Sequence, residues 1–285
     1  MFPLSDNYIH DALPINPAFA GSHDALSATL SYRNQWEGFS DAPKNQTLSL
    51  HSPFNNDRVG LGLLVERNSI GIFNETSLIG NYAFRMNIND GKLSLGLGFG
   101  AIVHYSAWNE LVAADANDQK LMNNPPTAVL PDFSIGAYYY TKKYFVGLSM
   151  PLLLSHELDE STGDYLVRND RHGYNYFLSG GYAIDINSQV KILPSVLIKY
   201  HPDNPLQIDY NTHVILDNKI WMGLGYRNKN SLVGMLRMQL NYQIRLGFSY
   251  NFDLGGMQKY KNGSHEIVLN YVFRYSRKVI GPRHF

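Results

Sequence analysis

The stretch that decides the fold is Gly91–Trp108, which reads GKLSLGLGFGAIVHYSAW. The odd-numbered positions of Leu93–Ala107 are apolar, whereas the even-numbered positions of Ser94–Ser106 are small or polar, apart from Ile102. A helix places neighbouring side chains about 100° apart, so this pattern would leave a helix without an apolar face. An extended strand points alternate side chains to opposite faces. The pattern therefore predicts a β-strand with one apolar face and one small, polar face.

The length of this stretch indicates a strand that crosses a membrane. A strand in a globular domain usually has about 5–6 residues, whereas a tilted strand needs about 9–11 to cross a bilayer. The glycines on its second face suit a wall that bends around a lumen. We expect Leu93, Leu95, Leu97 and Phe99 to face lipid. A Leu97→Arg change near the midplane should then cost about 2–4 kcal/mol, and Gly98→Ser should be mild.

The same alternation recurs along the chain and predicts an all-β protein, a closed antiparallel outer-membrane β-barrel of about fourteen strands. The barrel should span residues 25–275, after an N-terminal lead-in or plug segment at 1–24 and before a periplasmic tail at 276–285. The other predicted strands are Ala25–Trp36, Asn45–Phe54, Arg58–Asn68, Phe73–Ile88, Asp132–Tyr140, Tyr144–Ser155, Gly173–Asp185, Val190–Tyr200, Leu206–Leu216, Lys219–Arg227, Ser231–Gln239, Tyr242–Phe252 and His265–Tyr275.

The joints between these strands alternate in length. One set is short: Asn55–Asp57, Asn89–Gly91, Thr141–Lys143, Ile186–Gln189, Asp217–Asn218 and Leu240–Asn241. The other set is long: Glu37–Lys44, Asn109–Pro131, His156–His172, His201–Pro205 and Asp253–Ser264. Outer-membrane barrels have short periplasmic turns and longer outer loops. We therefore expect the long joints on the cell surface and both termini on the periplasmic side.

The composition of the chain excludes several classes of function. The chain has 285 residues with 24 Lys and Arg against 24 Asp and Glu, so no bulk charge attracts nucleic acid. It has no cysteine, which excludes a disulfide framework and thiol catalysis. No apolar run is long enough for a helical membrane span. The first residues lack the basic and apolar regions of a signal peptide, so the signal of an exported protein would already be removed.

No motif in the chain predicts catalysis. The glycines of Gly96–Gly100 lie inside a continuing strand, whereas a phosphate loop must lie between a strand and a helix. The histidines show no HExxH spacing, and no GxSxG is present. The loop acids around Asp115 and Asp159 lack the glycine and terminal glutamate of a calcium loop. We expect neither an enzyme nor a metal or cofactor site.

Charged residues at the polar positions of the alternating strands should face the lumen. The candidates are Glu66, Arg85, Lys191, Lys199, Asp209, Arg245, Glu266 and Arg274. One interpretation is a hydrated or plugged lumen in which these charges pair. The other is a conduit, or a cavity that binds a peptide.

The N-terminal third carries a more specific pattern. Asn16–Ser22 reads NPAFAGS, Tyr32–Phe39 reads YRNQWEGF, and Ala42-Pro43 follows. In order and spacing these motifs resemble the opening of the PorP/SprF family, outer-membrane proteins of the Bacteroidota type IX secretion system. The resemblance covers essentially the whole chain, although its tail after the last strand, SRKVIGPRHF, departs from barrels that end on an aromatic residue. The signature residues are Asn16, Pro17, Ala18, Gly21, Tyr32, Arg33, Gln35, Trp36, Gly38, Phe39 and Pro43.

The resemblance implies a non-enzymatic role in secretion or surface anchoring, including the anchoring of adhesins used in gliding motility. The implied partners are a secreted surface protein, held through its C-terminal domain, and periplasmic ring and peptidoglycan-binding components. For the signature itself we expect a turn at the Asn-Pro and Ala-Gly pairs that leads into the first strand. Trp36 and Phe39 should lie at the outer aromatic girdle, and Arg33 should point into the lumen.

The long outer joints are the predicted partner-binding surface, because they are rich in residues that make hydrogen bonds. The candidate contact residues are Asn109, Asp115, Asp118, Asp159, Asp164 and Tyr165. The alternative is a transporter or porin for small or hydrophobic molecules, since fatty-acid transporters also have about fourteen strands. An apolar lumen with a lateral gap would favour the transporter, whereas a lumen blocked by residues 1–24 would favour anchoring.

Overall fold

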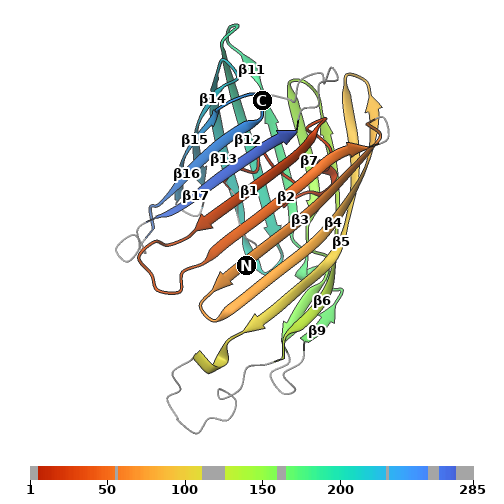
Figure 1. Cartoon of the computed structure of the whole chain (residues 1–285), viewed down its shortest axis with the longest axis vertical. Helices are drawn as coiled ribbons and strands as arrows, with labels where there is room; N and C mark the ends of the chain where they lie inside the picture. The colour runs from red at the N-terminus through yellow and green to blue at the C-terminus, as the bar shows by residue number, and fades with distance from the viewer. Residues whose placement is uncertain are drawn as a thin grey trace.

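The computed structural model describes residues 6–54, 57–110, 126–158, 165–228, 231–255 and 263–273. It is a closed antiparallel barrel of tilted strands, as predicted (Figure 1). β10 and β11 both pair with β12 and form one wall strand interrupted at Ala183, so the fifteen strands of the sheet make fourteen in the wall. The wall strands are β1 Leu26–Asn34, β2 Lys44–Phe54, β3 Val59–Ile70, β4 Phe73–Ile88, β5 Gly91–Ser106, β6 Ala128–Tyr140, β7 Tyr144–Met150, β10 Tyr176–Tyr182 with β11 Ile184–Asp185, β12 Val190–His201, β13 Asn204–Leu216, β14 Ile220–Arg227, β15 Ser231–Gln239, β16 Ile244–Asp253 and β17 Ser264–Phe273.

The two faces of the wall follow the predicted parity. On β5, Leu95, Leu97 and Phe99 are 46%, 61% and 61% exposed on the outer face. Gly96 and Gly98 between them are buried on the lumen side. The strand begins at Gly91 as predicted and ends two residues earlier than predicted, at Ser106. Exposed apolar side chains continue around the other wall strands, which gives the barrel the apolar outer band that a bilayer requires.

The two ends of the barrel differ in the length of their joints. One end, here termed the short-turn end, carries the joints 55–58, 89–90, 141–143, 186–189, 217–219 and 240–243. The other, the long-loop end, carries the four longest joints, 35–43, 107–127, 151–175 and 254–263. It also carries short turns at 71–72 and 202–203. The prediction of a long joint at His201–Pro205 is therefore wrong. β12 reaches His201 and β13 already begins at Asn204, because the proline after it is tolerated at the start of a strand.

The wall is irregular where β7 should continue toward the long-loop end. β7 stops at Met150, one residue before Pro151, rather than at the predicted Ser155. β6 extends to Ala128, so Pro131, which was expected in a loop, lies within a strand. β7 pairs only with Ile135–Tyr140 of β6, which leaves Pro131 on a part of β6 that pairs with β5 alone. Proline, which has no N–H to donate, is tolerated on such an edge.

A small hairpin follows this break and was not predicted. It consists of β8 Ser155–Leu158 and β9 Tyr165–Arg168, which form a separate two-stranded sheet. Each strand has four residues, too few for alternation to stand out against a loop. Part of the predicted outer joint His156–His172 is therefore regular structure.

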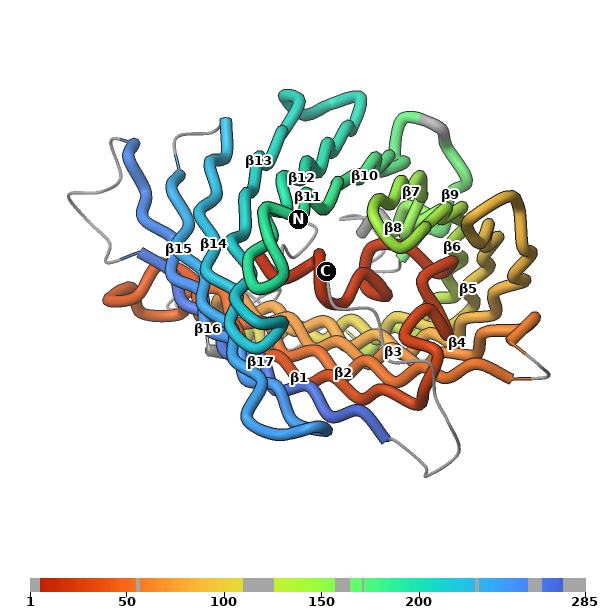
Figure 2. The backbone as a smooth tube through the Cα atoms, turned by 90° about the horizontal axis from the view of Figure 1, so that it is seen from above, coloured from red at the N-terminus to blue at the C-terminus, as the bar shows by residue number. Residues whose placement is uncertain are grey.

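Residues 6–24 lie inside the barrel. Figure 2 shows this segment, in red, within the ring of strands. Its apolar side chains, among them Tyr8, Leu13 and Phe19, form one buried cluster with lumen-facing residues such as Leu193 and Trp221. The hydrophobic core of the protein is thus in the lumen, between the segment and the wall. Residues 6–24 are here termed the lumen segment.

The direction of the lumen segment corrects one expectation. Its last residues lead into β1, which begins at Leu26 at the short-turn end. Its first described residue, Asp6, pairs with Arg33 and Arg227, which lie near the long-loop ends of β1 and β14. The start of the described chain therefore does not lie at the short-turn end, where both termini were expected.

Helical structure in the described residues is confined to the 3₁₀ turns η1 Pro17–Phe19, η2 Trp108–Glu110 and η3 Arg171–Gly173. None of the described helices has the length and apolar character needed to cross a membrane.

Leu97 offers a direct test of the outer face. We expect Leu97→Arg to lower the free energy of unfolding in lipid vesicles by about 2–4 kcal/mol, because an arginine there would face hydrocarbon. Urea titration followed by tryptophan fluorescence measures this loss. Leu97→Met is the control and should change little, because it keeps the site apolar. A similar stability for both variants would contradict a membrane-facing Leu97.

Candidate functional site

The signature residue Asn16 fixes the lumen segment to the wall. Its side-chain oxygen accepts the N–H of Ala18 at 2.9 Å and so caps the short helix η1. Its amide nitrogen donates to the carbonyl oxygens of Ala137 on β6 and Leu148 on β7, at 3.0 and 3.4 Å. Pro17 follows at the first helical position, where its fixed φ and missing N–H suit a helix start. The predicted Asn-Pro turn is therefore a capped helical turn docked on the wall, some residues before β1.

Two wall serines hold the same part of the segment. The Ser94 hydroxyl on β5 donates to the carbonyl of Ala18 at 2.6 Å, and that of Ser149 on β7 donates to the carbonyl of Ile15 at 2.6 Å. Gly21 lies in the left-handed region, with φ of 76°, and its N–H donates to Nδ1 of His51 at 3.2 Å. These contacts satisfy backbone groups that would otherwise be buried without partners.

Lumen-facing glycines make room for the segment. A Cβ on Gly96 would lie 2.1 Å from the backbone nitrogen of Ala18, and one on Gly60 would lie 2.0 Å from the carbonyl oxygen of Ala20. A Cβ on Gly136 would lie 2.1 Å from the side-chain oxygen of Asn16. Of these three glycines, Gly96 was attributed to the bend of the wall. The contacts show that close approach of the lumen segment requires them.

The expected mildness of Gly98→Ser stays a prediction, because the atoms nearest to an added Cβ are the ends of side chains rather than backbone. A Cβ on Gly98 would lie 2.1 Å from the hydroxyl of Ser134 and 2.8 Å from the amide oxygen of Asn81. Both side chains would have to move before a serine could be accepted.

The second part of the signature shapes the joint after β1. Gln35 donates its N–H to the carbonyl of Pro43 at 2.9 Å and so closes the joint. Trp36 and Gly38 have positive φ of 53° and 97°, as this turn requires. Trp36 is half-buried and donates its backbone N–H to the Ser264 hydroxyl at 3.2 Å. Tyr32 and Phe39 are exposed at the long-loop end, at 37% and 46%.

Asp6 lies at the centre of a buried charge network, here termed the Asp6 network. Its carboxylate pairs with Arg33, and with Arg227 at 3.0 Å. Arg33 also lies 3.4 Å from Glu266, its direct neighbour across β1 and β17. The network continues through Asp209, which pairs with Arg227 at 2.8 Å and with Lys199 at 3.2 Å. Three acids thus balance three bases, which is the condition for burying charge. Burial raises the pKa of Asp6, but Arg33 and Arg227 outweigh this effect and hold it below its usual value.

The remaining predicted lumen charges are dispersed. Arg85 pairs with Asp24 at 2.6 Å, and its guanidinium donates to the Tyr140 hydroxyl at 3.0 Å. Arg245 lies over the Trp221 ring, and Lys191 is half-buried 3.9 Å from Asp185 at the short-turn end. Arg274 and the tail 276–285 lie outside the described residues.

Two histidines of the lumen segment are held neutral. Burial lowers the pKa of His10 and of His23 well below the usual 6.5, and neighbouring cations and histidines lower it further. The His10 ring contacts those of His213 and Trp221, with centroids 5.7 and 6.1 Å away.

Acid should therefore loosen the lumen segment. Above pH 6.5 the two histidines are neutral whether the segment is inserted or displaced, so their burial costs no proton. As the pH falls below 6.5, the displaced segment takes up protons that the inserted segment cannot, and the free energy that favours insertion decreases. Amide exchange of residues 6–24, corrected for its intrinsic rate, should be faster at pH 5 than at pH 7.5. The His10→Gln, His23→Gln double variant is the control and should show a shallower pH dependence. An unchanged slope would contradict the assignment.

A cavity of about 750 Å³ lies between the lumen segment and the long-loop end of the barrel, and is here termed the vestibule. Leu13, Pro14, Asn16 and Pro17 of the segment contribute to its lining. Wall residues from β2 to β6, β10, β12 and β13 form its sides. Its volume lies in the range of about 300–1,000 Å³ that ligand sites occupy.

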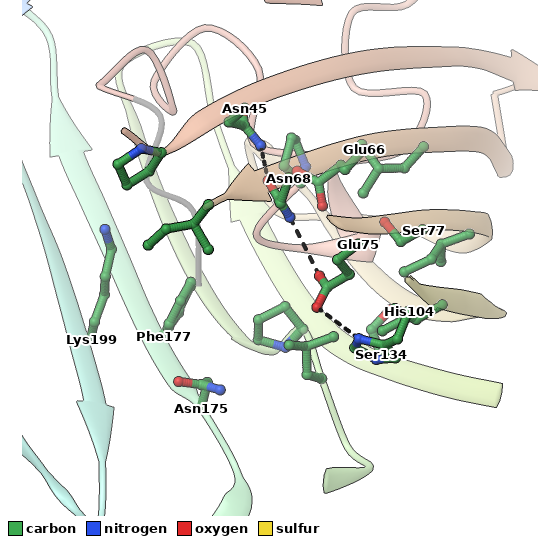
Figure 3. Close-up of a pocket in the computed structure, with 18 of the residues that line it drawn as sticks. Asn45, Glu66, Asn68, Glu75, Ser77, His104, Ser134, Asn175, Phe177 and Lys199 are labelled. Carbon is green, nitrogen blue, oxygen red and sulfur yellow. Dashed lines mark hydrogen bonds and ion pairs between the residues drawn. The ribbon is translucent and has the colours of Figure 1, made fainter. Parts of the chain in front are cut away.

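One side of the vestibule carries a ladder of hydrogen bonds across neighbouring strands (Figure 3). Asn45 donates to Asn68 at 2.5 Å, and Asn68 donates to Glu75 at 3.4 Å. The other oxygen of Glu75 lies 3.7 Å from Nδ1 of His104. Glu66 lies beside this ladder and accepts a hydrogen bond from the Thr47 hydroxyl at 3.4 Å. Of the predicted lumen residues, Glu66 and Lys199 line the vestibule.

The predicted partner-binding residues fall partly outside the described residues. Asn109 lies in η2, and Tyr165 begins β9 and stacks on His104 with ring centroids 5.0 Å apart. Tyr165 also lines the vestibule. Asp115, Asp118, Asp159 and Asp164 lie in segments that the structure does not describe.

Sequence reasoning missed several residues of the site. Asp6, Asp24 and His51 are isolated in sequence, and their partners lie on distant strands. A usable signal existed for Arg227 and Arg237, because both share the parity of buried residues such as Trp221 and Val233 on their own strands. Glu75 likewise shares the inward parity of Ser77 on β4.

The closed barrel, its apolar outer band and the many polar side chains on the inner side of its wall define the chain as an outer-membrane β-barrel protein. Residues 2–271 match the family described as type IX secretion system membrane protein PorP/SprF. The chain belongs to this family, and its place is the outer membrane. The resemblance of the N-terminal motifs to this family is thereby confirmed.

Solved barrels share the fold at low sequence identity. The CymD monoaromatic hydrocarbon channel is 13% identical with a TM-score of 0.51, over 97% of this chain and 95% of that one. The Ralstonia pickettii toluene transporter TbuX is 9% identical with a TM-score of 0.51, over 93% of both chains. A Pseudomonas aeruginosa FadL homologue is 13% identical with a TM-score of 0.51, over 92% and 94%. No curated protein matches the chain.

Proposed function

We propose that this chain is a non-enzymatic barrel that holds, or helps to export, a secreted surface protein at the outer membrane. The secreted protein, of the adhesin type used in gliding, would dock its C-terminal domain on the long-loop end. The short-turn end would face the periplasmic ring and the peptidoglycan-binding components of the secretion system. Family membership supports the coarser statement, a membrane component of type IX secretion.

One observation carries the proposal. The lumen segment occupies the barrel interior and contributes to the floor of a vestibule in the long-loop half. Asn16, the serines of β5 and β7 and the Asp6 network all hold it there. A solute pore needs an open lumen, whereas a docking site needs a cavity with a fixed floor. This arrangement favours docking.

The described residues also bear on metal binding. No group of three or more His, Cys, Asp or Glu in that part of the chain is placed to hold a metal ion.

Loss of the chain should release a surface protein. In the producing bacterium, deletion of its gene should move one secreted protein from the cell surface to the medium, and the wild-type gene should restore it. A variant lacking Asp115–Asn124 should also release the protein while the barrel still assembles. An unchanged surface proteome would contradict the proposal, as would porin-like conductance of the purified wild-type barrel.

A transporter for small hydrophobic molecules is the second candidate, and one observation favours it. An apolar hollow of about 770 Å³ lies on the outer face, lined by Leu97, Phe99 and Phe133 together with Leu153 and Leu154 from the joint after β7. This is the place where the wall loses its regular pairing. Uptake of toluene into proteoliposomes above the rate of protein-free vesicles would support this candidate over anchoring.

A further inference from the structure

The vestibule holds two carboxylates on neighbouring strands. Glu66 on β3 is 8% exposed and accepts a hydrogen bond from the Thr47 hydroxyl at 3.4 Å. Glu75 on β4 is half-buried and is held by the Asn68 amide at 3.4 Å and by His104 at 3.7 Å. Figure 3 shows both on the same side of the cavity. A buried carboxylate is costly unless a cation compensates it.

The described residues that line the vestibule do not supply that cation. Lys199 lines the opposite side, but its ammonium is already paired with Asp209 at 3.2 Å. Lys44 lies at the rim and is exposed, on the opposite parity to the buried Asn45. The imidazoles of His104 and His201, which also line the vestibule, count as cations only when protonated. The acidic side of the vestibule is therefore complementary to a positive group from another molecule.

The rest of the lining suits a peptide. Primary amides recur around the cavity, at Asn45, Asn68, Asn74, Asn81, Asn175, Asn204, Gln35 and Gln207. Each amide both donates and accepts, as a peptide backbone does. Apolar contact is available on Leu64, Ile102 and Phe177. The cross-strand ladder holds Asn68 and Glu75 in place before any ligand arrives, which lowers the entropic cost of binding.

We propose that the vestibule binds an extended peptide segment of the secreted partner that carries a Lys or Arg side chain, with Glu66 and Glu75 as its counter-ions. The proposal rests on the proposed function, since it names the chemistry by which that partner is held. The cationic side chain would reach Glu75 near the rim and Glu66 deeper in the wall, while the amides pair with the peptide backbone.

The test uses the purified full-length barrel in nanodiscs and a fluorescein-labelled octapeptide of Ser and Thr with one central Arg. The same peptide with citrulline is the uncharged isostere. Fluorescence anisotropy should show binding of the Arg peptide below about 1 mM, and at least about tenfold weaker binding of the citrulline peptide. The Glu66→Gln, Glu75→Gln double variant should lose that difference. Glu37→Gln, outside the vestibule at the same end, should keep it.

Three results would overturn the proposal: no binding of the Arg peptide by the wild type at about 1 mM, equal binding of the two peptides, or an unchanged preference in the double variant. Glutamine preserves the shape of glutamate, and resistance of the folded barrel to SDS at room temperature checks that the variant has assembled. Glu75→Lys provides an independent arm, since it should shift the preference to a peptide with a central Glu.

The cellular experiment separates this proposal from the anchoring function. If the wild type holds a secreted protein at the surface and the double variant holds it equally well, the counter-ion proposal is wrong and anchoring stands. If the wild type holds none, anchoring itself is wrong, whatever the peptides do.

Discussion

Arg33→Met should destabilise the folded barrel by about 3–5 kcal/mol, because it leaves buried carboxylates without their cation. Arg33 lies between Asp6 and Glu266 and is almost fully buried. The methionine fills much of the same volume, so the loss reflects charge and hydrogen bonding rather than a cavity. Urea unfolding in lipid vesicles measures it.

Arg67→Met is the matched control. Arg67 is exposed at the long-loop end of β3, and exposed charges contribute about 0–1 kcal/mol. A second variant separates pairing from packing: with Asp6→Asn in the same chain, Arg33→Met should cost less than it does alone. Equal losses for Arg33→Met and Arg67→Met would contradict the Asp6 network.

Gly96→Val should displace the lumen segment. A Cβ at Gly96 would lie 2.1 Å from the nitrogen and 2.4 Å from the Cα of Ala18, and backbone atoms cannot turn aside as a flexible side chain can. Overpacking of this kind costs about 1–3 kcal/mol or more, and we expect the segment to move rather than the wall to open. Protease cleavage within residues 6–24 and the appearance of channel openings in planar bilayers measure the displacement.

Gly80→Val is the control for this prediction. Gly80 faces outward on β4, where the nearest atom to an added Cβ is the Phe99 carbonyl oxygen at 3.7 Å. Valine is favoured in strands, so this variant should assemble normally and keep the conductance of the wild type. If residues 6–24 of Gly96→Val resist the protease and no channel openings appear in the bilayer, the segment does not pack against β5.

Strand alternation was enough to predict the barrel. Leu95, Leu97 and Phe99 alternate with glycines over a span longer than globular strands need, and the structure has that strand at Gly91–Ser106. The signal failed where strands are short or broken. The four residues of β8 show no period, and Pro131 indicated a loop where β6 continues and pairs with β5 alone.

The candidate site was less accessible to sequence reasoning, because its contacts are non-local. Asn16 was singled out by its motif, but its partners Ala137 and Leu148 could not be read from the motif. The inward parity of Glu66 was predictable, whereas the lack of a cation beside it depends on how Lys199 and Asp209 pair across two other strands. Chain order carries no information on which charges meet in a lumen.

Site-specific photo-crosslinking in the producing bacterium shows whether a secreted protein enters the vestibule. A photo-reactive residue in place of Ile70, which lines the vestibule outside the hydrogen-bond ladder, should form a covalent adduct with a secreted surface protein. The same residue in place of Leu97, which faces outward on β5, should form no such adduct. An Ile70 variant that assembles but captures no secreted protein would contradict anchoring at the vestibule, and so would equal capture from Leu97.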